Sequence, residues 1–70
     1  MLTVNEKIRI MAKRNRMTLG SIADALGESR QGFSNKLSRN DFDESEIRAI
    51  AAALGAEVSI IFRLSDGTDL

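Results

Sequence analysis

Cysteine and histidine, two residues that often carry chemistry in proteins, are missing from this 70-residue sequence. Without cysteine, the chain has no disulfide framework, no thiolate nucleophile and no thiolate zinc site. Without histidine, it lacks the usual acid–base catalyst and metal ligand. No nucleophile–base pair, phosphate-cradling loop or metal constellation appears elsewhere. We therefore expect no catalytic residue, no metal, no cofactor and no small-molecule ligand.

Long apolar runs are absent as well. No segment approaches the ~18 apolar residues of a membrane-spanning helix, and the first residues do not resemble a signal peptide. Internal repeats, linkers and low-complexity segments are also lacking. We therefore expect one small soluble domain over residues 1–70, located in the cytoplasm and without a membrane partner. A core of this size is marginal alone and often gains stability from a partner subunit.

The net charge is zero, but the charges are unevenly distributed along the chain. Residues 1–40 contain eight basic and three acidic side chains, a net charge of +5. Residues 41–70 contain two basic and seven acidic side chains, a net charge of −5. This asymmetry indicates one end that faces a polyanion and one that faces solvent. Chance segregation in a small protein is the alternative interpretation.

Apolar spacing and capping residues predict four helices. The predicted helices cover residues 4–15, 19–26, 30–38 and 44–54. Each is preceded by a residue suited to the N-cap: Thr3, Thr18, Ser29 and Asp43. Glu6 and Glu46 complete capping boxes at the first and fourth helices. Gly27 and Gly55 suit the left-handed position that ends a helix.

Apolar stripes at helical spacing define the predicted core. Its members are Val4, Ile8, Met11, Ala12, Leu19, Ile22, Ala23, Leu26, Phe33, Leu37, Ile47, Ile50, Ala51 and Leu54. The third helix differs from the others because only Phe33 and Leu37 in it are large and apolar. A helix that only had to fold would use better helix formers on its outer side.

The apolar period changes near the end of the chain. Apolar residues at every second position from Val58 to Leu64, separated by Ser59, Ile61 and Arg63, predict a strand over residues 57–64. Asp66-Gly67 is a tight-turn signal, and residues 68–70 could form a short return strand. A lone hairpin is marginal, and an apolar edge favours pairing with another strand. We therefore expect a homodimer through this strand, with a cap over the chain's own helices as the alternative. The expected interface residues are Val58, Ile60, Ile61 and Phe62.

Residues 18–37, TLGSIADALGESRQGFSNKL, contain two short helices joined by a glycine-containing turn, which is a helix-turn-helix pattern. A small residue, Ala23, precedes the turn glycine, Gly27, by four positions, and Phe33 follows as the first apolar anchor of the next helix. This segment resembles the helix-turn-helix of the Cro/C1-type (lambda-repressor-like, XRE) family of bacterial and phage DNA-binding regulators. The resemblance implies a mainly α fold, a four-helix lambda-repressor-like domain, here followed by the C-terminal β-strand or hairpin.

The sequence departs from the family pattern at three places. Leu19 and Gly20 stand where the family usually has Gln near the start of its second helix. Lys36 occupies the position of the second apolar anchor, so Leu37 is expected to face inward instead. The predicted strand replaces a fifth helix that some members use for dimerisation, although strand-mediated dimers exist in the Cro branch.

The resemblance implies that the third helix enters the major groove with its N-terminal residues at base edges. The side-chain chemistry agrees, because Arg30 can read guanine, Gln31 and Asn35 can read adenine, and Ser34 can read either. The expected base-edge set is Ser29, Arg30, Gln31, Ser34 and Asn35. The expected phosphate contacts are Thr18, Lys36, Arg39, Asn40 and Arg14. The alternative is that these side chains are only a solvated surface.

Together these patterns predict a sequence-specific transcriptional regulator that binds double-stranded DNA. The expected form is a homodimeric repressor that acts on a palindromic operator and is associated with the nucleoid. The second hypothesis is a protein-interaction module, such as an antitoxin or an anti-repressor, that uses the same helical scaffold.

Overall fold

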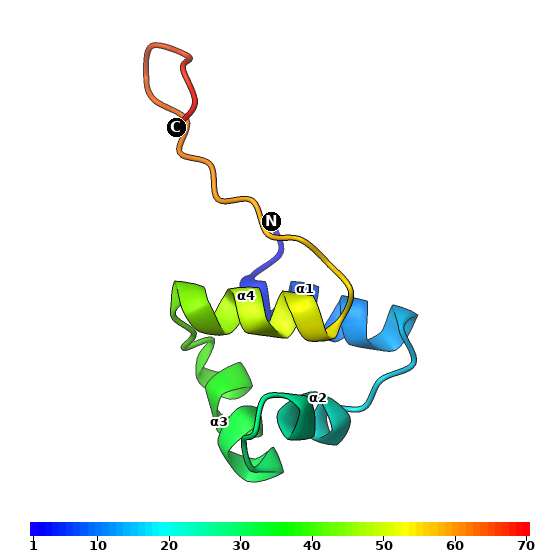
Figure 1. Ribbon diagram of the computed structural model, residues 1–70. Helices are drawn as coiled ribbons and strands as arrows, with labels where there is room; N and C mark the ends of the chain where they lie inside the picture. Colours follow the sequence, from blue (N-terminus) through cyan, green and yellow to red (C-terminus); the bar gives the residue numbers. More distant parts are fainter.

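The computed structural model describes all of residues 1–70 and is mainly helical, as the sequence predicts. Its helices are α1 (Val4–Arg14), α2 (Leu19–Ala25), α3 (Arg30–Arg39) and α4 (Glu44–Ala53). Every boundary lies within one residue of the predicted one. Figure 1 shows α1 and α4 on one side of the helical part, α2 and α3 on the other, and the C-terminal segment leading away from them.

Each helix begins at the N-cap residue that the sequence predicts. The hydroxyl or carboxylate oxygens of Thr3, Thr18, Ser29 and Asp43 accept hydrogen bonds from backbone N–H groups three residues later. Glu6 and Glu46 close the predicted capping boxes. Ser21 closes another at α2, where its hydroxyl accepts a hydrogen bond from the Thr18 N–H at 3.1 Å. The capping-box pattern in sequences has Glu or Gln at this position, so Ser21 was not predicted to take this role.

Two left-handed residues end α2 and α3. Gly27 has φ of 71°, as predicted for the residue after α2. Asn40, at φ of 52°, ends α3, and its side-chain oxygen accepts a hydrogen bond from the Asn5 N–H at 3.0 Å. The same side chain thus terminates α3 and satisfies a free N–H group in the first turn of α1.

The core lies where the helices meet and agrees with the predicted apolar stripes. Its buried cluster consists of Ile8, Ala12, Ile22, Ala23, Phe33, Leu37, Ile50 and Leu54. Phe33 also contacts Phe42, with the ring centroids 6.2 Å apart. α2 packs against both α3 and α4 through this cluster. Because the buried Ala23 has only a methyl group, α2 can approach its neighbours closely.

The predicted C-terminal strands are wrong for this chain. Residues 57–64 and 68–70 form no strand, and only an isolated antiparallel bridge joins Arg63 to Asp69. Phe62 and Leu70 exchange two backbone hydrogen bonds of 2.8 Å around the predicted turn, but residues 57–61 make none with other backbone groups. An alternating pattern cannot form a strand by itself, since a strand requires a neighbour for its hydrogen bonds. We refer to residues 57–70 as the tail.

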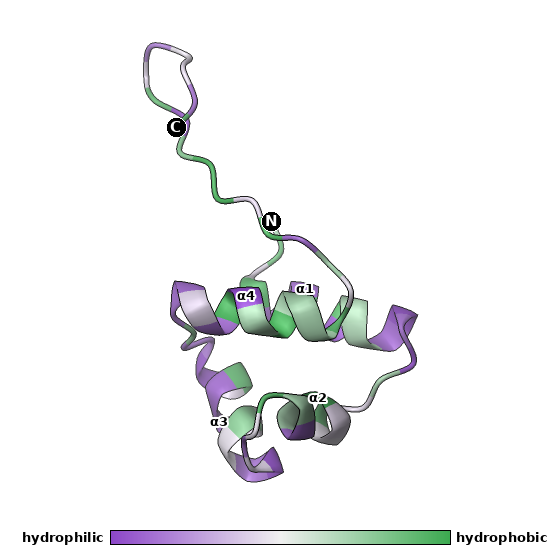
Figure 2. Cartoon of the chain, viewed as in Figure 1, coloured by the Kyte–Doolittle hydropathy of each residue, from purple (hydrophilic) through white to green (hydrophobic).

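Only the base of the tail, around Val58, lies against the helices. Figure 2 shows its apolar stretch extending away from the helical part. Ile60, Ile61 and Phe62 are all exposed, so the intramolecular cap does not form. None of the four helices combines the length and the apolar content that crossing a lipid bilayer requires.

Candidate nucleic-acid interface

The orientation of α3 is determined by its two apolar anchors. Phe33 and Leu37 are fully buried and lie four residues apart, on one side of the helix. Around the rest of the helix surface are Arg30, Gln31 and Asn35, which are exposed, and Ser34, which is half-buried. We call these four residues the outer face of α3. The surface is polar, contains no carboxylate and is not covered by another helix.

Two contacts organise the outer face. The Gln31 side-chain amide donates a hydrogen bond to the Asn35 side-chain oxygen at 3.0 Å, one helical turn away. Arg30 extends beside the start of α2, where its Cδ would lie 3.7 Å from a Cβ built on Gly20. The guanidinium of Arg30 has no carboxylate partner. The face therefore offers a free cation beside a pair of coupled amides.

Ser29 and Thr18, both predicted to contact DNA, cap helices. The Ser29 hydroxyl accepts a hydrogen bond from the Gly32 N–H at 3.0 Å, at the start of α3. The Thr18 hydroxyl accepts one from the Ser21 N–H at 3.1 Å, at the start of α2. Both residues remain exposed, but capping alone accounts for their presence.

The structure separates Lys36 from the other predicted phosphate ligands. Its ammonium forms ion pairs with Glu28, at 2.7 Å, and with Glu46. These two hydrogen-bonded carboxylates raise the pKa of Lys36 above that of a free lysine, with Glu28 the larger cause. Lys36 is therefore already paired with two carboxylates of its own chain. The side-chain oxygen of Asn40 is similarly engaged with the Asn5 N–H.

Arg39 and Arg14 remain available as phosphate ligands. Both are exposed, and neither forms an ion pair. Arg39 makes only a long 3.5 Å hydrogen bond to the Asn35 carbonyl. Of the eight basic residues in positions 1–40, only Lys36 is ion-paired. The free ones are Lys7, Arg9, Lys13, Arg14, Arg16, Arg30 and Arg39.

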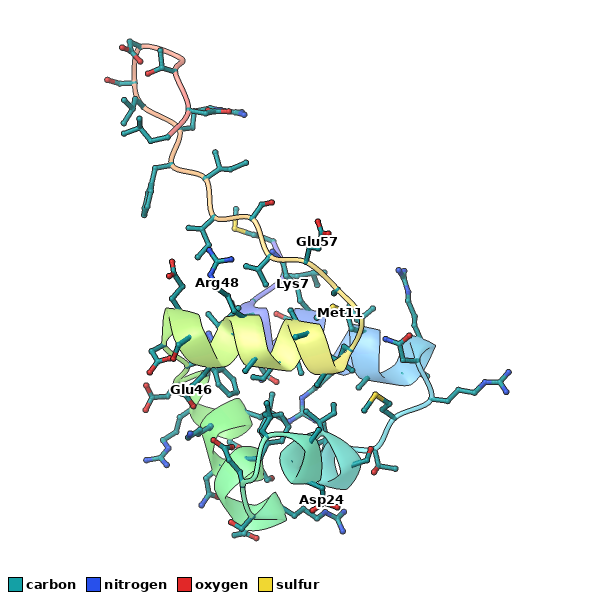
Figure 3. The ribbon with its side chains drawn as sticks, viewed as in Figure 1. Lys7, Met11, Asp24, Glu46, Arg48 and Glu57 are labelled. Carbon is teal, nitrogen blue, oxygen red and sulfur yellow. The ribbon has the colours of Figure 1, made fainter.

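The predicted dimer residues surround a different feature, at the base of the tail. Val58 is half-buried and, with Ile60, lines an apolar groove of about 310 Å³ whose other walls come from α1 and α4. Figure 3 shows Lys7, Met11, Arg48 and Glu57 around this region. The Arg48 guanidinium donates a 3.4 Å hydrogen bond to the Val58 carbonyl. Beyond this point Ile61 and Phe62 extend into solvent.

The sequence analysis missed the ion pairs of Lys36. Its carboxylate partners lie eight and ten residues away, outside the three- and four-residue spacing that identifies pairs on a helix surface. The acidic cluster at the start of α4 could have suggested a cation nearby, although helix-start capping explained it locally. No group of three or more Asp or Glu side chains is arranged to hold a metal ion.

Comparisons of the chain with protein-family models, with curated proteins and with solved structures found no match. The functional interpretation therefore rests on the geometry of the chain itself and on the residues described above.

Proposed function

We propose that this chain binds double-stranded DNA in a sequence-specific manner, with α2 and α3 acting as a helix-turn-helix. The observation that carries the proposal is the outer face of α3, which has a free guanidinium, two amides and no carboxylate. The buried anchors Phe33 and Leu37 hold this face outward. The resemblance of residues 18–37 to the Cro/C1-type family supports the same interpretation.

The roles within the outer face follow from hydrogen-bonding chemistry. Arg30 would donate two hydrogen bonds to guanine, and Gln31 or Asn35 would bind the donor–acceptor edge of adenine. The hydrogen bond between Gln31 and Asn35 orients each amide before DNA arrives. Phosphate contacts would come from Arg39 and Arg14. We do not include Lys36 and Asn40 among the phosphate ligands, because both side chains already interact with other residues of the chain.

We further infer a homodimer formed through the tail. Residues 57–61 make no hydrogen bonds with other backbone groups, and Ile60 and Ile61 are exposed, so pairing with a second tail would satisfy backbone groups and cover apolar side chains. A two-fold dimer would present two α3 helices to half-sites about 34–36 Å apart, on a palindromic operator. Such a protein would act as a repressor on the nucleoid by occupying DNA that polymerase needs.

The second candidate is a protein-interaction module, such as an antitoxin or an anti-repressor. The exposed run from Ile60 to Phe62 favours it, because a different protein could cover those side chains as well as a second copy could. The two candidates differ in whether the outer face of α3 contacts the bases of DNA.

The deciding experiment is a binding-and-sequencing selection from random duplex DNA, with light scattering on the same sample. We expect a dimer that enriches a palindrome with half-sites one helical turn apart. Arg30→Ala should then cost about 1–3 kcal/mol on the enriched site and relax specificity at one base pair. Arg9→Ala, which removes a guanidinium from α1 outside the proposed DNA contacts and the tail, is the matched control and should retain the sequence specificity. No enriched sequence, together with capture of a protein partner, would support the second candidate instead.

A further inference from the structure

One ammonium connects three consecutive segments of the chain. Lys36 lies on α3, Glu28 in the turn that precedes α3, and Glu46 in the first turn of α4. The side chains of these residues are 33%, 27% and 28% exposed, so the ion pairs lie partly inside the protein. We call these three residues the Lys36 clamp.

Both carboxylates of the clamp are constrained by their surroundings. Glu46 also closes the capping box of α4, where its other oxygen accepts a hydrogen bond from the Asp43 N–H at 3.4 Å. Glu28 has one oxygen on Lys36, and its second oxygen is buried without a hydrogen-bond partner. Glu28 therefore depends on Lys36 as its sole side-chain partner. Turning Lys36 outward to a phosphate would leave that partly desolvated carboxylate uncompensated.

The clamp restricts the rotation of α3 more specifically than apolar packing in the core does. Apolar packing of Phe33 and Leu37 pulls α3 inward, but the hydrophobic effect has no direction of its own. Charge-assisted hydrogen bonds require a particular geometry. Lys36 precedes Leu37, at the border of the buried side, and its two partners lie on segments at both ends of α3. The ion pairs therefore restrict rotation of α3 about its axis.

We propose that Lys36 is a positioning residue that fixes the rotation of α3 about its axis, within the orientation that the apolar anchors set, and does not itself contact phosphate. This inference rests on the proposed DNA binding. It reverses the role that the sequence suggested for Lys36, and it assigns Glu28 and Glu46 an indirect part in recognition.

The salt dependence of DNA binding distinguishes the two roles of Lys36. Each phosphate contact that is lost should flatten the slope of log affinity against log salt by about one. Arg39→Gln, which removes an unpaired cation on the same helix, is the matched control and should produce that change. Lys36→Met should leave the slope unchanged and weaken binding to the selected site by about tenfold, with binding to random duplex unchanged. A slope flattened as in Arg39→Gln would overturn the proposal.

A second measurement tests the clamp without DNA. Glu46→Gln retains the capping box, because Gln closes it as well as Glu does. Thermal melts of Lys36→Met, Glu46→Gln and the double variant should be non-additive, with Glu46→Gln costing less once Lys36 is gone. Strictly additive melting shifts would refute the clamp.

The two measurements also separate two kinds of failure. If the unmodified chain binds no duplex DNA, the proposed function is refuted, and the role of the clamp in recognition is refuted with it. If the chain binds DNA and the melts are additive, the proposed function stands and only the clamp is refuted.

Discussion

Phe33 and Phe62 lie in two regions of this molecule that differ in how far they bury the same type of side chain. Phe33 is 0% exposed in the helical part, whereas Phe62 is 69% exposed in the tail. A helix satisfies its own backbone hydrogen bonds, so it needs only an apolar surface against which its apolar stripe can pack. An extended segment must find both a backbone partner and an apolar cover. The helical part provides these within one chain, and residues 57–61 do not.

The largest expected effect is loss of folding on Phe33→Ala. Removing a fully buried phenylalanine typically costs about 3–5 kcal/mol, which is a large share of the stability of a small domain. We expect circular dichroism to show a large fall in melting temperature or no cooperative transition. A Phe33→Ala variant that melts like the unmodified chain would contradict the conclusion that Phe33, unlike Phe62, stabilises the helical part.

Phe62→Ser should leave the helical part intact and disrupt association. Because Phe62 makes no buried contact in the single chain, the helical signal should be unchanged. We expect light scattering to show a dimer dissociation constant at least about tenfold higher, because an aromatic side chain at the centre of an interface typically costs about 2 kcal/mol or more when it is removed. Ser59→Ala, which changes an exposed polar side chain of the same tail, is the control. An unchanged dissociation constant would show that Phe62 does not contribute to the dimer and would favour a different partner for the tail.

Alanine substitutions at two glycines with left-handed backbone conformation compare the stability of the two regions. Gly27 and Gly67 have φ of 71° and 92°, and a Cβ at either would meet nothing within 4 Å, so only backbone strain opposes alanine. Gly27→Ala should destabilise the helical part by about 1–2 kcal/mol. Gly67→Ala carries a similar strain but lies in the tail, so the helical melting temperature should not change. Equal shifts in the two melts would mean that the tail folds with the helices.

The smallest expected effect concerns two aspartates whose pKa values are lowered. Hydrogen bonds from the Glu46 N–H and the Ser45 hydroxyl lower the pKa of Asp43, and hydrogen bonds from Thr68 lower that of Asp66. A carboxylate with a lowered pKa stabilises the fold above its ordinary pKa of 3.8 and loses that contribution as the pH falls through the lowered value. For Asp43, at the start of α4, this loss should appear in the helical melting temperature.

Melts between about pH 2 and pH 5 would measure this difference. Asp43→Asn keeps an N-cap side chain but does not titrate, so its melting temperature should decline less steeply with acid than that of the unmodified chain. Asp66→Asn should leave the acid dependence of the helical melt unchanged. A flatter acid dependence in Asp66→Asn would contradict the independence of the tail.

Local chemistry explains why most of the fold was predictable. Thr3 and Asp43 find their capping partners three residues away, and the spacing of Phe33 and Leu37 defines the inner side of α3. The outer face was predictable for the same reason, since it consists of the residues that lie outside the stripe of these anchors. The predicted strand was wrong because an alternating pattern carries no information about a neighbouring strand.

The sequence by itself determined where the helices begin and end, which stripes become the core, and which polar side chains of α3 face outward. These features depend on groups within about one helical turn of each other. Only the tertiary structure decided that Lys36 meets Glu28 and Glu46, that Asn40 reaches Asn5, and that the tail stays uncovered. Asn5 and Asn40 are 35 residues apart in the chain. Such contacts depend on how the helices pack, and local spacing does not specify that packing.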